Sequence, residues 1–183
     1  MGTPREPNPV KLFIGMLTGD PALFGRCTDL LSGQYGPVEM ESPVRDWSYS
    51  DYYGEEIGAP LFRKFIAFRQ VVDPATLAST KLRTNSIEAS LALGDTTRMR
   101  RTINLDPGYV AEAKVVLATT KDYAHRIYIG DGIYAEVTLL YRKAEQGFIA
   151  LDHTYPDFCS AEVRQWFLAV RERLRAGLAA KTP

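Results

Sequence analysis

The sequence predicts a single α+β domain in which a mixed β-sheet carries helices mainly on one face. Three observations lead to this class. The chain has 183 residues, which is enough for one ordinary domain. An apolar run, an Asp-Pro pair and a helix-like segment follow one another three times before residue 121. A β-hairpin and an amphipathic helix come after them, so an antiparallel element joins the alternating strands and helices.

The three Asp-Pro units place the first strands and helices. An Asp side chain accepts hydrogen bonds from the free amides of a first helical turn, and Pro suits the first helical position. We therefore expect Asp20, Asp73 and Asp106 to cap helices that follow strands. The expected strand and helix pairs are 11–17 with 22–31, 62–72 with residues from 75 onward, and 99–105 with 109–120.

The segment between the first two units adds a strand and a loop. Gly36-Pro37 ends the first helix and precedes a strand over 38–41. Residues 46–58 are aromatic and polar without a regular period, so we expect an ordered loop there. The whole order is β-α-β-β-α-β-α-β-β-α, and its first half is roughly ferredoxin-like.

The clearest local structure is a hairpin over 125–142. A three-residue loop over 130–132 places the apolar residues of both strands on one face, whereas a two-residue turn would scatter them. This register pairs Ile127 with Ala135 and Ile129 with Ile133. The apolar face then holds Ile127, Ile129, Ile133, Ala135, Val137 and Leu139. The opposite face holds Arg126, Tyr128, Tyr134, Glu136 and Thr138, with Arg126 across from Glu136.

The chain closes with a helix over 161–176, for which Ser160 is the N-cap. Apolar residues recur along it at helical spacing, with arginines on the other side. We expect the domain to span 10–176. An extended or disordered segment over 1–9 precedes it, and a fraying end over 177–183 follows.

Composition and charge exclude several classes of protein. Lys and Arg total 22, as do Asp and Glu, so the formal net charge is zero and a generally basic nucleic-acid binder is excluded. Two cysteines are too few for a disulfide framework, and the chain lacks His-x-x-x-His and Cys-x-x-Cys metal spacings. No apolar run approaches membrane-spanning length and the N-terminus has no signal-peptide core, so we expect a cytoplasmic protein away from membranes.

Several stretches resemble a known family. They are Pro9-Val-Lys-Leu-Phe-Ile-Gly-Met-Leu, Ser50-Asp-Tyr-Tyr, Ile103-Asn-Leu-Asp-Pro-Gly-Tyr-Val, Leu117-Ala-Thr-Thr-Lys, His125-Arg-Ile-Tyr and Gly132-Ile-Tyr-Ala-Glu-Val-Thr-Leu. They resemble an uncharacterised bacterial family, the domain of unknown function 4416, over about 9–171. The resemblance implies no activity, substrate or catalytic residue. Its members often carry the label "GTP-binding protein", but the Gly-x-x-x-x-Gly-Lys-Ser/Thr loop that cradles phosphate is absent here.

Polar residues within these stretches exceed what a fold requires, and we take them as a candidate site. Arg126 and Glu136 could form the floor of a site on a sheet, although a solvated cross-strand ion pair explains them too. Lys114 lies in an almost wholly apolar segment and either extends its charge to solvent or points into a pocket. Glu136 and Asp106 are the candidate catalytic residues. The candidate ligand-binding residues are Arg100, Asn104, Lys114, Lys121, Arg126 and Tyr128, with Asp51 and Tyr52 as a lid.

Three functions of different classes fit these residues. The first is binding of an anionic or phosphorylated small molecule, nucleotides included, with or without catalysis; the cofactor is unknown. The second is RNA binding through the basic segment Arg98–Arg101 and exposed tyrosines. The third is a homo-oligomeric interaction module whose surface comprises Trp47, Tyr49, Tyr52 and Tyr53.

Overall fold

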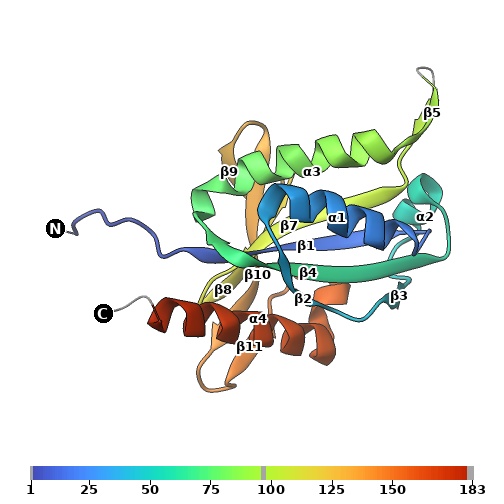
Figure 1. The fold of residues 1–183 in the computed structure, drawn as a ribbon. Coiled ribbons are helices and arrows are strands. Elements are labelled where there is room, and N and C mark those ends of the chain that lie inside the picture. Colours follow the sequence, from blue (N-terminus) through green and yellow to red (C-terminus); the bar gives the residue numbers. More distant parts are fainter. Residues whose placement is uncertain (1, 96–97, 181–183) are drawn as a thin grey trace.

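The computed structural model describes residues 2–95 and 98–180 and confirms the α+β class. Three long helices surround one large sheet (Figure 1). The helices are α1 (Leu23–Tyr35), α2 (Asp51–Ile57), α3 (Leu77–Leu91) and α4 (Ala161–Ala179), with short 3-10 helices η1 (Pro74–Thr76) and η2 (Pro156–Cys159). The strands are β1 (Val10–Thr18), β2 (Val38–Glu41), β3 (Arg45–Trp47), β4 (Leu61–Val72), β5 (Leu93–Asp95), β6 (Arg98–Arg100), β7 (Ile103–Val110), β8 (Lys114–Thr119), β9 (Ile127–Gly130), β10 (Ile133–Arg142) and β11 (Gly147–Ala150).

The sheet has the strand order β11-β10-β8-β7-β1-β4-β2, with β3 beside β4 and β9 beside β10. Its part β7-β1-β4-β2, with α1 and α3 as connections, is the ferredoxin-like arrangement expected from the sequence. The expected mixed sheet is wrong in one respect, because all the pairings between described strands are antiparallel. The reason is that each helical connection skips a position in the sheet, and an antiparallel strand fills that position.

Strand β1 carries the core on both of its faces. Leu12, Ile14 and Met16 pack on the side of α1 and α3, and Phe13 packs on the side of α4. Every residue of β1 is buried, which is why its sequence is a continuous apolar run rather than an alternating one. Two long helices thus share one face, as expected, and α4 covers the other (Figure 1).

The three expected helix caps have different outcomes. Asp73 is confirmed as the N-cap of η1, which leads into α3, and accepts the amide of Ala75. Asp20 accepts the amide of Ala22 in the turn before α1, but the N-cap position of α1 is Ala22. Asp106 instead lies inside β7, opposite Gly15 of β1, and no helix follows it. The segment expected as a helix over 109–120 completes β7 and forms β8. Its all-round apolar character arises because residues 115–118 are buried on both faces of the sheet.

Smaller corrections concern the loop, the hairpin and the last helix. The expected loop over 46–58 contains the end of β3 and helix α2, and α4 continues to Ala179. In the hairpin, Ile127 pairs with Ala135 as expected, but Ile133 pairs with Gly130 rather than Ile129. The bulge arises because Asp131 and Gly132 both have positive φ and form a two-residue turn. A second irregularity after Val137 turns Leu139 to the α4 side.

Candidate functional site

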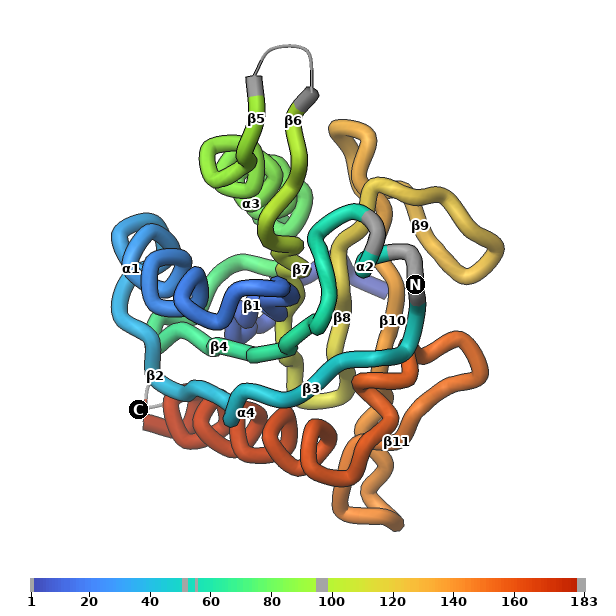
Figure 2. Tube along the Cα trace, turned by 90° about the vertical axis from the view of Figure 1, so that its right-hand side faces the viewer, coloured from blue at the N-terminus to red at the C-terminus, as the bar shows by residue number. Residues whose placement is uncertain are grey.

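A cleft opens where strands β7 and β8 part from each other. They pair only through Gly108–Val110 and Val115–Leu117, beside the turn that joins them. Beyond this joint, β7 stays paired with β1, whereas β8 stays paired with β10. Pro107 stands at the branch point and has no N–H with which to continue the ladder. The sheet is therefore split at this end, next to α2 and α3 (Figure 2).

The split encloses a cleft of about 320 Å³, whose walls come from the sheet, α2, α3 and the segment before α4. Among the side chains that the structure describes, the charged lining is balanced. The basic residues are Arg63, Lys81, Arg101 and Lys121, and the acidic residues are Glu88, Asp106, Glu136 and Asp157. The aromatic residues Trp47, Tyr53 and Tyr155 also line it.

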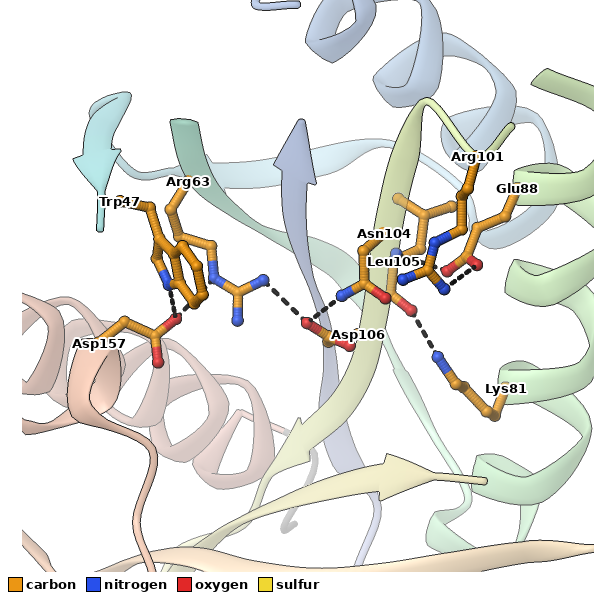
Figure 3. A network of polar contacts seen from close by, with 9 residues as sticks. All are labelled: Trp47, Arg63, Lys81, Glu88, Arg101, Asn104, Leu105, Asp106 and Asp157. Carbon is orange, nitrogen blue, oxygen red and sulfur yellow. Dashed lines mark hydrogen bonds and ion pairs between the residues drawn. The ribbon is translucent and has the colours of Figure 1, made fainter. Parts of the chain in front are cut away.

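Arg63 of β4 joins two carboxylates at the inner end of the cleft. Its Nη1 donates to Asp106 Oδ2 and its Nε donates to Asp157 Oδ2, both at 2.8 Å. Trp47 donates to the same Asp157 oxygen at 3.3 Å, and Asn104 donates to Asp106 at 2.7 Å (Figure 3). The guanidinium also lies 5.0 Å from the ring centre of Phe65. One arginine thus ties β4 to β7 and to η2.

These ion pairs keep both partners charged at neutral pH. Burial opposes ionisation of Asp106, but Arg63 and Lys81 outweigh it and hold the pKa of this carboxyl below its usual value. Burial likewise disfavours the charged guanidinium, yet Asp157 and Asp106 outweigh it and raise the pKa of Arg63. A carboxylate with a lowered pKa is a weak proton acceptor, so Asp106 is better suited to positioning than to acid–base catalysis.

Two side chains of α3 take the place of a neighbouring strand along the free edge of β7. Lys81 Nζ donates to the carbonyl of Leu105 at 2.8 Å, and Glu88 Oε1 accepts the amide of Leu105 at 2.6 Å (Figure 3). The amide and the carbonyl of Leu105 are therefore both hydrogen-bonded, although β8 does not pair with β7 at this position. Glu88 also pairs with Arg101 at 3.3 Å, and Arg101 pairs with Glu56 at 3.1 Å.

Lys81 stands out among the buried cations of the described chain. Lys11, Arg63 and Arg171 are buried too, and each has a carboxylate within 2.8 Å. Lys81 is 6% exposed, lines the cleft and has no carboxylate within 4 Å among the described residues. Its three ammonium protons make one hydrogen bond within that part of the chain, to Leu105.

A second polar cluster surrounds Glu136 on β10. Arg126 Nε donates to Glu136 Oε2 at 2.8 Å, so these residues interact across the hairpin, as the expected pairing requires. Arg126 also donates to the carbonyl of Lys121 and to the hydroxyl of Tyr155, at 2.9 and 2.7 Å. Glu136 is 2% exposed, and His125 Nε2 lies 3.2 Å from the same Oε2 atom. The expectation of a solvated pair is wrong, because this pair is enclosed beside the cleft.

The structure brings together about half of the residues expected to form the site. Asn104, Asp106, Lys121 and Glu136 line the cleft, and Arg126 lies directly behind Glu136. The others lie apart: Arg100 is exposed on β6, Tyr128 is exposed on the hairpin, and Lys114 lines a different cleft at the opposite end of β8. The side chains of Asp51, Tyr52 and Arg98 lie outside the part of the structure that is described.

Several residues that the tertiary structure brings to the cleft are not evident from local sequence patterns. Arg63 lies within the apolar run of β4, and Asp157 lies in a segment before α4 that has no helical or strand period. Lys81 and Glu88 are seven residues apart, which is two turns of α3 and one face of that helix. The seven-residue spacing of Lys81 and Glu88, together with an Arg inside an apolar strand, is the sequence feature from which these cleft residues could be predicted.

The positions of these residues also bear on the expected RNA-binding segment and on the expected aromatic interaction surface. Arg101 is ion-paired inside the cleft, so the basic segment Arg98–Arg101 is not one continuous patch. Trp47 and Tyr53 line the cleft rather than a separate surface, whereas Tyr49 is half exposed. Within the described residues, no cluster of three His, Cys, Asp or Glu side chains is arranged to hold a metal ion.

Comparisons with known proteins give one match. The family model described as "Domain of unknown function (DUF4416)" matches residues 8–174. Neither the curated proteins nor the solved structures contain a significant match. In the part of the chain that the structure describes, no helix combines the length and apolar character needed to cross a bilayer.

Proposed function

The chain belongs to the family described as domain of unknown function 4416, and we propose that its cleft binds a small molecule carrying an anionic group such as a phosphate or a carboxylate. The observation that carries this proposal is the buried ammonium of Lys81. A buried charge is normally paired, because removing it from water is costly. Asp106 and Glu88 act on this ammonium only from beyond 4 Å, and an anion in the cleft would supply the direct ion-pair partner that the described residues do not.

The neighbouring cations support the same ligand. Arg101 also lines the cleft, and its buried Nε has no hydrogen-bond partner among the described residues. Lys121 approaches from the end of β8 and Arg63 from β4. The carboxylates of the cleft accept hydrogen bonds from Arg63, Arg101, Arg126 and the amide of Leu105, so they hold basic groups in place. Because the four basic and four acidic side chains of the lining cancel, an added anion would depend on the local positive charge at Lys81 rather than on a net positive cleft.

The test is a thermal-melt screen with inorganic phosphate, sugar phosphates, nucleotides, divalent metals and short RNA. A ligand at 100 times its dissociation constant stabilises the fold by about 2.7 kcal/mol, which is several degrees in melting temperature for a domain of this size. We expect small phosphorylated or carboxylated compounds to raise the melting temperature and Lys81→Met to abolish that increase.

Lys114→Met is the matched control, because Lys114 lies in the cleft at the other end of β8. We expect it to keep the full response. Loss of the response in both variants, or no response of the wild-type protein to any small anion, would overturn the proposal. Stabilisation by RNA alone would favour RNA binding instead.

A further inference from the structure

Building on the proposed function, we infer that the ligand of this cleft carries a planar ring in addition to its anionic group. The ring would pack against an aromatic wall formed by Trp47, Tyr53 and Tyr155. These residues come from β3, α2 and the segment before η2, and all three line the cleft. The expected ligands are therefore aromatic or heterocyclic anions rather than aliphatic ones.

The geometry of the wall supports a ring. Trp47 and Tyr53 meet edge to face, with centroids 5.6 Å apart and planes at 79°. Edge-to-face pairs are favourable in themselves, so the two rings hold each other in position. Tyr155 is fixed by the hydrogen bond from Arg126 to its hydroxyl. An aromatic surface that is held in place before binding loses little entropy when a flat ligand packs on it.

Apolar side chains enclose the same space. Leu17, Leu117 and Ala118 line the cleft together with the aromatic residues. Leu17 also packs in one cluster with Trp47 and Tyr53, so the apolar part of the cleft is continuous with its aromatic wall. A purely polar anion such as inorganic phosphate would leave this surface in contact with water. A ring would cover it.

The phenol groups can also bind polar atoms of such a ligand. Burial, Asp106 and Tyr155 raise the pKa of Tyr53, and burial and Glu136 raise the pKa of Tyr155. Both hydroxyls therefore stay protonated at neutral pH. Tyr53 interacts electrostatically with Arg63, Arg101 and Asp106, and Tyr155 with Arg126 and Glu136, so both phenols are close to the charged residues of the cleft.

Trp47 is a reporter for this inference. The chain has two tryptophans, and Trp166→Phe leaves Trp47 as the only one. Trp166 belongs to α4 and packs against the core cluster between this helix and the sheet. Its buried Nε1 makes no hydrogen bond to a described residue, so the substitution removes no hydrogen bond to that part of the chain. We would titrate this variant with phenyl phosphate, glycerol 3-phosphate and inorganic phosphate, following fluorescence and, in parallel, calorimetry.

We expect phenyl phosphate to bind about two- to tenfold more tightly than glycerol 3-phosphate, the range of one aromatic contact, and to change Trp47 fluorescence. In wild-type protein, Tyr53→Leu and Tyr155→Leu should weaken binding of phenyl phosphate more than binding of inorganic phosphate, so that the preference for the ring is lost. Tyr128→Leu is the control, because Tyr128 is exposed on the hairpin outside the cleft. Tyr155 is 42% exposed, so its variant remains informative if Tyr53→Leu fails to fold.

The outcomes separate the two proposals. Equal affinity for phenyl phosphate and glycerol 3-phosphate would overturn the inference of a ring and leave anion binding intact. Binding of none of the three probes would overturn anion binding and, with it, the ring. A preference for phenyl phosphate that persists in both tyrosine variants would show that the ring binds elsewhere, and would overturn the aromatic wall.

Discussion

Arg63 is the residue on which the inner end of the cleft depends. It is 7% exposed and bridges Asp106 and Asp157. Replacing it by Ala leaves two carboxylates without their partner, and breaking a buried ion pair from one side costs about 3–5 kcal/mol. We expect urea unfolding of Arg63→Ala to show a loss of this size.

Arg45→Ala is the control for that measurement. Arg45 pairs with Glu162 at 3.4 Å, and the two side chains are 35% and 65% exposed. Exposed ion pairs are screened by water and contribute little to stability, so this variant should unfold almost like the wild type. Equal losses in the two variants would contradict the role assigned to Arg63.

Asp106 makes the stability of the protein depend on pH. Its pKa in the folded protein lies below 3.8, the value expected for an ordinary Asp. The unfolded chain therefore binds a proton at higher pH than the folded one, and the stability that Asp106 contributes is lost as the pH falls through this range. We expect the difference in unfolding free energy between wild type and Asp106→Asn to be constant from pH 7 to pH 5 and to shrink below pH 4.

Local sequence reveals some residue roles and conceals others. Asp20, Asp73 and Asp106 all precede Pro, and the first two accept backbone amides where the chain turns into a helical segment. Asp106 does not, because Pro107 lies on a strand edge where the missing N–H is harmless. An Asp-Pro pair fits both the start of a helix and the edge of a strand. Only the position of β8, which leaves the edge of β7 free at Pro107, distinguishes the two cases. Lys81 and Arg63 were not found for a related reason, since their partners lie 24 or more residues away.

At the scale of elements, the joint between β7 and β8 depends on Gly108. A Cβ atom there would lie 2.5 Å from the Phe13 ring and would overlap the carbonyl oxygen of Val116. The Gly108→Ala variant must displace the core or separate the strands, and overpacking of this kind costs about 1–3 kcal/mol. We expect denaturant unfolding to show this loss and phosphate binding to weaken with it.

A second glycine provides the comparison. Gly25 lies in α1, and a Cβ atom there would meet no atom within 4 Å. Ala is the better helix former by about 0.5–1 kcal/mol, so Gly25→Ala should stabilise the protein. If both Gly→Ala variants lowered stability alike, the close approach at Gly108 would not be the cause.

At the scale of the whole molecule, helices cover the single large sheet on both of its faces. The ferredoxin-like half was predictable, because its order of strands and helices can be read from local patterns and capping residues. The side of the sheet that α4 covers was not predictable, because an amphipathic helix indicates that it packs on a surface but not on which one. Phe167 of α4 meets Phe13 of β1 with ring centroids 4.8 Å apart, and this contact closes the second face.

Phe167→Ala tests whether this contact between α4 and the sheet stabilises the fold. Phe167 is fully buried among Phe13, Phe65 and Phe158. Large-to-small substitution of a buried Phe costs about 3–5 kcal/mol. We expect a cooperative unfolding transition at a correspondingly lower urea concentration. Leu82→Ala, at an exposed position of α3, should change the midpoint little, and a similar shift in both would contradict a core that includes α4.

The split between β7 and β8 also has a consequence for how such proteins diversify. One wall of the cleft belongs to the four-stranded ferredoxin-like unit and the other to strands added beside it. Gly108 lies at the joint but does not line the cleft, so a substitution there would act on the spacing of the two walls without replacing a lining residue. Related chains could therefore differ in the width of this cleft through residues at the joint alone, while the charged residues of its lining stay as they are.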